Sequence, residues 1–402
     1  MESQLRELLD LVVRWVHVIA GIMWIGNSLL FNWLDRNLEK PTDEEQRIAK
    51  AKGEVLEGRI WLLHSGGFYD VVKKQLAPNS LPAALHWFKW QNFSTWLSGI
   101  GLLVIVYYSG GAALLVDAQV QKLSPFIGVT IGISSIVASW FFYDLLWLSP
   151  LRNRGWIAAS LSFAWIGFVA YGLTHLLSGR GAFIHIGVIL GTVMTGNVWF
   201  VIVPSQRELV AATQEGRVQD ASIGLRAKQR SIHNNYMTFP LLFVMISNHF
   251  PTTYGTKFNW IILAVLSIGG ALVRHFMNIR FWYGAWGPAM TATIAATLGV
   301  LFFLTRPPPR VTTDRQVSYA EARAIVERRC LQCHSANPTD DTWRVAPNGL
   351  MFDTPERMVI MAPRMKERAC VQKTMPLNNK TNMTDEERAA IAQWVDEGSP
   401  TQ

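Results

Sequence analysis

The sequence predicts an all-α protein in which a polytopic bundle of about eight membrane-spanning helices is followed by a small α-helical domain. Half of the residues are hydrophobic, and they fall into long runs. Most runs approach the ~20 residues that a helix needs to cross ~30 Å of hydrocarbon. The runs near 236–250 and 258–273 are short, so seven spans or one re-entrant segment remain alternatives. The eight runs are 11–33, 94–115, 125–148, 157–177, 182–204, 236–250, 258–273 and 285–305.

A change of composition near residue 306 predicts the domain boundary. Pro307, Pro308 and Pro309 begin a polar and charged tail. Three consecutive prolines are typical of a stiff connector between domains. We therefore expect a membrane domain over 1–306, a Pro-rich linker over 307–315 and a tail domain over 316–402. The 17 Trp residues fit side chains that prefer the membrane interface.

The distribution of Lys and Arg predicts which way the spans face, because these residues are retained on the cytoplasmic side. The first, third, fifth and seventh loops carry most of them, whereas the other loops offer only Lys122, Arg180 and Lys257. Both termini should then lie outside the cytoplasmic membrane. Nucleic-acid binding, the usual reading of a net charge of +8, is not expected because the charge is arranged as an orientation signal.

The tail contains a motif for covalent haem attachment. Cys330 and Cys333 flank two residues and are followed at once by His334. Two thiols one helical turn apart can each form a thioether to haem, and the adjacent His then ligates the iron. A redox dithiol or half of a zinc site would lack the immediate His. Met375 is the expected second axial ligand, with Met351, Met361 and Met365 as rivals, and Cys370 is expected to be a packed or free thiol.

The rest of the tail fits a small cytochrome c domain with one covalent haem c. A helix is expected over Tyr319–Arg329, leading into the motif. Thr384 should cap a last amphipathic helix, with acidic residues in its first turn. In bacteria, haem c is attached outside the cytoplasmic membrane, so the motif also predicts a periplasmic tail. The charge distribution and the motif thus agree on the topology.

Four segments together resemble the bacterial membrane-bound urate oxidase family with a C-terminal cytochrome c domain. The segments are Trp15–Ser28 (WVHVIAGIMWIGNS), His64–Tyr69 (HSGGFY), His86–Trp90 (HWFKW) and Arg230–Tyr236 (RSIHNNY). The resemblance covers essentially the whole chain. The first loop carries Ser65 where that family is richer in glycine.

The resemblance implies oxidation of urate to 5-hydroxyisourate in purine catabolism. Electrons would leave through haem c to a respiratory acceptor, such as a soluble cytochrome c or a terminal oxidase, and not directly to oxygen. Two alternatives from other classes remain. One is a membrane-anchored electron-transfer cytochrome, which would need only one or two spans. The other is a quinone- or cytochrome-linked dehydrogenase of another small molecule, which would share every feature but the pocket.

The remaining histidines divide into two groups by expected depth. His17, His175, His185 and His249 fall near the outer ends of their spans, and a pair of them could hold a b-type haem. For any single one, the plainer interpretation is a satisfied polar side chain at a helix end.

The inner group supplies the side chains that a planar anion such as urate requires. Cationic donors, amides and aromatic faces bind such a ligand, and a His or Tyr can remove a ring proton. Lys89 and Arg230 could instead serve only as membrane anchors. The substrate candidates are His64, Tyr69, His86, Lys89, Arg230, His233, Asn234, Asn235 and Tyr236.

Other functions find less support in the sequence. A transporter is favoured by helices broken by Gly or Pro at mid-depth, and no mid-depth Pro is expected in these spans. The chain has no Gly-rich phosphate loop, dinucleotide fingerprint or nucleophile elbow. Nicotinamide and flavin chemistry are therefore not expected.

Overall fold

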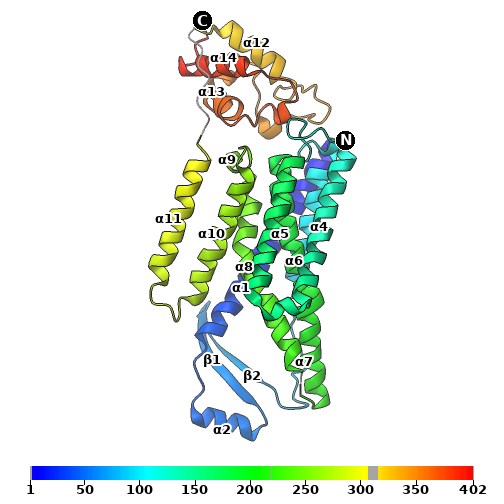
Figure 1. Cartoon of the computed structure of the whole chain (residues 1–402), viewed down its shortest axis with the longest axis vertical. Coiled ribbons are helices and arrows are strands. Elements are labelled where there is room, and N and C mark those ends of the chain that lie inside the picture. Colours follow the sequence, from blue (N-terminus) through cyan, green and yellow to red (C-terminus); the bar gives the residue numbers. More distant parts are fainter. Residues whose placement is uncertain (1, 219, 307–315, 402) are drawn as a thin grey trace.

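The computed structural model describes residues 2–218, 220–306 and 316–401, and it is mostly helical. Long helices form an upright bundle, with a hairpin at one end and the tail domain at the other (Figure 1). The chain's amino terminus lies at the tail end of the bundle. The Pro-rich linker predicted over 307–315 lies outside the described residues.

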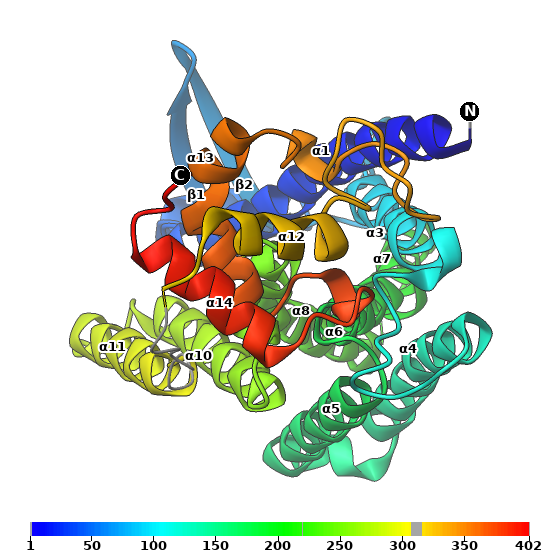
Figure 2. The ribbon, with the colours of Figure 1, turned by 90° about the horizontal axis from the view of Figure 1, so that it is seen from above.

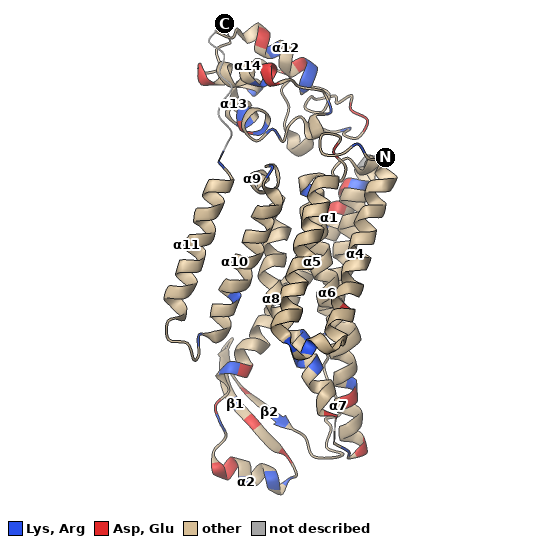
Figure 3. Ribbon diagram, in the orientation of Figure 1, with Lys and Arg blue, Asp and Glu red and all other residues tan. Residues whose placement is uncertain are grey.

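Six helices in the described part of the chain are long and apolar enough to cross a membrane, by length and composition. They begin and end at Gln4–Asn37, Pro125–Leu148, Gly155–Leu176, Gly179–Glu215, Asn259–Ile279 and Trp286–Leu304. They correspond to α1 (Glu2–Asn37), α4 (Pro125–Leu148), α5 (Gly155–Leu176), the run from α6 to α7, α10 (Asn259–Ile279) and α11 (Trp286–Leu304). Charged residues are nearly absent from the middle of this bundle (Figure 3).

The two other predicted spans are helical but do not meet the combined criterion of length, hydropathy and few charged residues. One is α3 (Trp90–Leu102), which continues as the π-helix η1 (Leu103–Tyr108) and packs on α1. The other is α8 (Ala221–Ser247), which packs on α6 and α10 and carries several buried polar side chains. The estimate of eight spans therefore exceeds the six that the structure supports by this criterion.

The central helix runs from α6 (Gly179–Gly196) through the π-helix η4 (Asn197–Ile202) into α7 (Val203–Glu215). It packs against α3, α4, α5 and α8, and α6 is the most buried helix of the bundle. Small residues allow this close packing. A Cβ on Gly196 would come within 2.2 Å of the Trp140 ring, and one on Gly132 within 2.4 Å of the His185 ring.

Pro240 lies inside α8, seven residues before the helix ends at Ser247. A Pro within a helix has no N–H, and here the carbonyl of Tyr236 loses its helical partner. Gly270 of α10 approaches the backbone of Phe239 and Pro240 at this point. Helix α8 is thus irregular where it faces α10.

A β-hairpin corrects the all-α expectation. After the short helix α2 (Asp43–Ala51), the strands β1 (Val55–His64) and β2 (Gly67–Gln75) pair antiparallel. Arg59 binds Asp70 across the strands at 2.5 Å, and Ser65 at the turn has a φ of 49°. Such a φ favours Gly, so a glycine-rich loop suits this position. The hairpin projects beyond the bundle (Figure 1).

The tail folds around its own core. Helix α12 (Tyr319–Arg329) has the predicted bounds, and Thr384 forms the predicted cap, within a capping box, for α14 (Asp385–Asp396). Between them lie α13 (Pro355–Met365) and the π-helix η6 (Lys366–Val371). Trp394, Ile391 and Met358 are fully buried among these helices. The remaining elements are η2 (Gly110–Ala112), η3 (Pro150–Asn153), α9 (Pro251–Tyr254), η5 (Pro347–Gly349) and η7 (Leu377–Asn379).

The tail domain lies over the end of the bundle that is opposite the hairpin (Figure 2). Asn378 Nδ2 donates to the carbonyls of Ala113 and Val116 at 2.8 and 2.7 Å. Arg6 of α1 lies over the Trp343 ring, 5.9 Å from its centroid. These contacts hold the tail in one defined position on the helical bundle.

Candidate functional site

A buried hydrogen-bonded Tyr–His pair lies between α4 and α8, in the half of the bundle nearer the hairpin. Tyr143 Oη and His233 Nδ1 are 2.7 Å apart. The His233 ring packs on Trp147, with centroids 4.0 Å apart. The aromatic neighbours fix the imidazole, which is the requirement for a group that transfers protons.

Arg230 lies beside this pair and is 3% exposed. It donates to Asp144 at 2.8 Å and to Asn197 Oδ1 at 3.3 Å, and it lies over the Tyr143 ring. Residues three and four apart share one face of a helix, so α8 presents Arg230, His233 and Asn234 together. The guanidinium is neutralised by the Asp144 carboxylate.

Two asparagines complete this first cluster. Asn197 is fully buried at the start of the π-helix η4 and donates to Tyr143 Oη at 3.0 Å and to Asn234 Oδ1 at 2.8 Å. Asn234 in turn donates to the Met194 carbonyl at 3.0 Å. π-Helical turns within α-helices are frequent at functional sites. We call Tyr143, Asp144, Trp147, Asn197, Arg230, His233 and Asn234 the α4–α8 cluster.

The opposite face of α8 carries a second cluster of the same side-chain types. Arg274 Nε and Asn278 Nδ2 of α10 both donate to Asn235 Oδ1, at 2.9 and 2.8 Å. Tyr236 Oη lies 2.7 Å from His275 Nδ1. These five residues form the α8–α10 cluster. Each cluster thus combines an arginine, a Tyr–His pair and two asparagines.

Four of the predicted substrate residues lie outside both clusters. His64 is at the hairpin turn, where it bonds only Ser65, and Tyr69 of β2 is 53% exposed. His86 is exposed in the segment before α3. Lys89 lies over the rings of Trp87, Trp90 and Trp199, with its Nζ 5.2 to 5.8 Å from their centroids.

The surroundings of Lys89 nevertheless contain unsatisfied polar groups. Gln91 Oε1, Asn92 Oδ1 and Trp199 Nε1 are buried and have no hydrogen-bond partner in the described chain. Asn92 reaches the central helix by donating to Thr195 Oγ1 at 3.1 Å. Buried polar atoms without partners are costly, so each calls for an explanation such as a bound ligand or water.

Sequence reasoning missed the partners that other helices supply. Tyr143, Asp144, Trp147 and Asn197 join the first cluster, and Arg274, His275 and Asn278 join the second. Asp144 offered a signal, because it is the lone acidic residue of the run 125–148. An ionisable residue within a span indicates function by default.

The motif predicted to hold haem c lies beside the core of the tail. His334 Nδ1 lies 3.0 Å from the Leu350 carbonyl, and its ring lies beside Phe352. A ring held at Nδ1 leaves Nε2 for the iron. Burial raises the pKa of the Cys330 thiol to about 12 and that of Cys333 to about 11. Of the two thiols, Cys330 packs against the apolar core of the tail.

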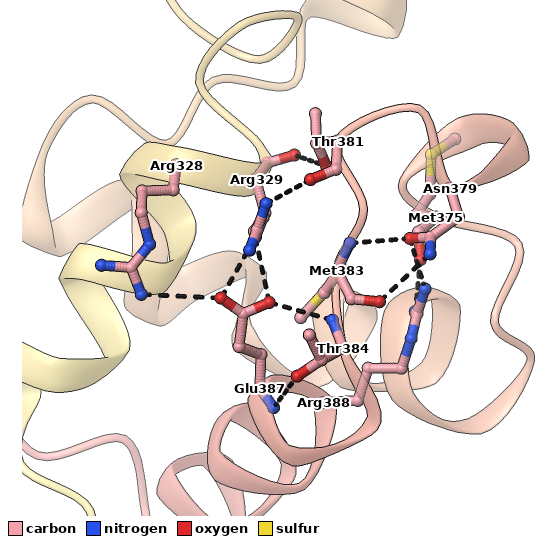
Figure 4. A network of polar contacts seen from close by, with 9 residues as sticks. All are labelled: Arg328, Arg329, Met375, Asn379, Thr381, Met383, Thr384, Glu387 and Arg388. Atoms are coloured by element: carbon pink, nitrogen blue, oxygen red, sulfur yellow. Dashed lines mark hydrogen bonds and ion pairs between the residues drawn. The ribbon is translucent and has the colours of Figure 1, made fainter.

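Met375 is the expected second ligand, and hydrogen bonds from Arg388 hold its segment in place. Arg388 donates to the Met375 carbonyl at 2.7 Å and to Asn379 Oδ1 at 3.0 Å, and Asn379 also binds Met383 (Figure 4). The side chain of Met375 is half-buried beside the tail core. Among its rivals, Met365 is buried within that core, Met361 packs against it, and Met351 accepts a hydrogen bond from Arg357. The residues present fit a haem c: Cys330 and Cys333 would bind it covalently, and His334 and Met375 would be the candidate ligands to its iron.

The four histidines considered for haem b do not gather in one place. His17 Nδ1 bonds the Thr95 carbonyl at 3.0 Å and Ser98 at 3.1 Å, near the middle of α3–η1 and not at its outer end. His185 uses both ring nitrogens, toward Gly181 and Tyr108. His175 and His249 are exposed. No contact joins any two of them among the described residues, and haem b at these positions stays a prediction.

The fold and these clusters define a helical bundle of membrane-spanning character with a buried polar layer in one half and a small α-helical tail. The model of one family, described as urate oxidase N-terminal, matches residues 3–305. This match covers most of the chain, which therefore belongs to the urate oxidase N-terminal family. Searches of curated proteins and of solved structures found no match.

Proposed function

We propose that the chain is a membrane-bound urate oxidase that passes electrons to a haem c in its own tail. The reaction converts urate and water to 5-hydroxyisourate, with the release of two electrons and two protons. The family match supports an oxidoreductase that acts on urate. The fit of Cys330, Cys333 and His334 to haem c supports an electron route that bypasses oxygen.

The observation that carries the proposal is the buried α4–α8 cluster. In the tautomer whose Nδ1–H donates to Tyr143 Oη, His233 keeps Nε2 free to accept a proton from the substrate. Arg230 and the amides of Asn197 and Asn234 hold the surroundings in place. Trp147 fixes the ring orientation. When bound in the tail, haem c would accept the electrons one at a time.

We place the protein in the bacterial cytoplasmic membrane, with both termini and the tail in the periplasm. The amino terminus and the tail lie at the same end of the bundle, opposite the hairpin (Figure 1). Both clusters then face the cytoplasm, where urate is produced. The electron acceptor for haem c is a soluble cytochrome c or a terminal oxidase that meets the exposed side of the tail.

A difference spectrum with anaerobic urate tests the proposal. Urate should reduce the haem c of the detergent-purified protein, giving the absorption bands of a ferrous c-type haem. His233→Ala and Arg230→Ala should abolish this reduction while dithionite still reduces the haem fully. His64→Ala, at the exposed hairpin turn, is the matched histidine control and should reduce normally. Haem c that ignores urate in the unsubstituted protein would contradict the proposed substrate.

A further inference from the structure

Arg274 is a buried cation without a carboxylate partner. It is 4% exposed on α10, a helix apolar enough to span a membrane. In the described part of the chain no Asp or Glu lies within ion-pair distance of it. Its Nε donates to Asn235 Oδ1 at 2.9 Å, and its terminal nitrogens have no acceptor there. Four of its five N–H groups are thus uncommitted.

The charged side chains that act on Arg274 increase its positive potential. They are Arg280 and Arg36, and both are cations. Arg36 lies 4.7 Å from the Trp282 ring centroid, and Arg280 lies 4.7 Å from that of Phe281. An anion held at Arg274 would offset this positive potential.

The comparison of the two faces of α8 shows what is missing. On the α4 face, Arg230 is paired with Asp144 at 2.8 Å. On the α10 face, Arg274 has the same neighbours, two asparagines and a Tyr–His pair, but an amide stands where a carboxylate would complete the pair. The α8–α10 cluster is therefore short of one negative charge, whereas the α4–α8 cluster is balanced.

We propose that Arg274 binds the negative charge of a small planar monoanion between α8 and α10, at a second position on the face of α8 away from His233, and that the anion is urate itself. This identity rests on the proposed function, since urate is a monoanion at neutral pH. Two or more guanidinium N–H groups can bind one anionic edge. Asn278 Nδ2 adds an amide donor, and the Tyr236–His275 pair lies beside the guanidinium.

The irregular backbone of α8 supports a ligand position here. Pro240 has no N–H, so the carbonyl of Tyr236, one turn earlier in α8 and next to Asn235, lacks its helical donor. Helices α8 and α10 are in close contact at Gly270, and Phe239 covers the other side of the Arg274 guanidinium, 5.7 Å from its ring centroid. The tight contact shields the cation from the outer half of the bundle, so the anion approaches from the hairpin end.

The decisive variant is Asn235→Asp in the full-length holoprotein. The new carboxylate takes the place of an oxygen that already accepts from Arg274 and Asn278, so it pairs Arg274 internally and preserves the fold. Arg274→Gln removes the charge instead, Arg274→Lys retains it, and Arg280→Gln removes a cation from the same helix end as control. The probe is 8-azaxanthine, a planar purine-like monoanion, measured by equilibrium binding in phosphatidylcholine nanodiscs with and without phosphatidylglycerol.

We expect Asn235→Asp and Arg274→Gln to weaken probe binding at this position between about 10-fold and 100-fold. Arg274→Lys should retain part of the affinity, Arg280→Gln should change it less than about 3-fold, and melting of Asn235→Asp should match the unsubstituted protein. If both variants still turn over urate and bind the probe as tightly as the unsubstituted protein, the inference is overturned.

Two further outcomes separate the site from the proposed function. Probe binding that depends on Arg274 in a protein that never oxidises urate would uphold the anion site and contradict the proposed reaction. Binding of phosphatidylglycerol that displaces the probe and that Asn235→Asp removes would assign Arg274 to a lipid phosphate and overturn the substrate assignment.

Discussion

The ion pair between Arg230 and Asp144 gives an asymmetric prediction for stability. The Arg230 side chain is 4% exposed, whereas that of Asp144 is 25% exposed. Asp144→Asn therefore leaves a cation that water cannot reach, and we expect a loss of about 3–4 kcal/mol. Arg230→Gln leaves a carboxylate that can hydrate, and we expect about 2 kcal/mol. The double variant should lose less than the sum, with a coupling of at least ~1.5 kcal/mol.

Thermal unfolding of the detergent-purified chain measures this cycle. At about 2–4 °C for each kcal/mol, Asp144→Asn should lower the apparent Tm by roughly 6–15 °C. The exposed pair Arg14–Asp10 is the matched control, and its removal should cost less than about 0.5 kcal/mol. Equal losses for the two single variants, or strict additivity in the double variant, would refute the argument from burial.

Three further predictions concern the tail. After denaturation, one thiol per chain should react with iodoacetamide if haem occupies Cys330 and Cys333; the folded protein should react slowly at pH 8, because burial raises the pKa of Cys370 to about 11. Asn378→Gly should speed hydrogen exchange over 110–116 by ~10–30-fold, by removing two hydrogen bonds to that segment. Glu387→Gln should flatten the pH dependence of tail stability. Burial opposes ionisation of Glu387, but the ion pair with Arg329 keeps the pKa of this carboxyl below its ordinary value. The stabilisation is therefore complete above ~pH 4.3 and disappears as the pH falls through the lowered pKa. Haem absorption during melting at several pH values checks the last.

Local signals predicted the tail well. The bounds of α12 and the cap at Thr384 follow from neighbours within a few residues, and the structure has both. The hairpin was missed because β1 and β2 lack a regular alternation: five of the ten positions of β1 and seven of the nine positions of β2 are exposed. A strand without a buried face leaves no period-2 pattern in the sequence. In the structure, the hairpin turn has a positive φ at Ser65 and Gly66.

The functional clusters were predicted in part for a related reason. Arg230, His233 and Asn234 share a face of α8 by spacing alone, so their association could be expected. Their partners Tyr143 and Asn197 lie on α4 and η4, and one sequence does not specify which helices pack together. Asn235 and Tyr236 point to the other face of α8, so a segment that reads as one motif serves two clusters.

The positions of the clusters set a problem for electron transfer. From His233 to the end of α8 at Ser247, an α-helix rises about 20 Å, and the tail lies beyond that end. Direct transfer to haem c over such a distance would be slow, since tunnelling decays steeply with distance. His17 lies near mid-depth, with Nδ1 held by Thr95 and Ser98 and no contact on Nε2, which is the form a ligand to iron requires. A pyridine haemochrome count of one non-covalent haem per chain, lost in His17→Ala, is the expected result. A count of only covalent haem would move the expected urate site toward the outer end of the bundle, and the inner clusters would then need another role.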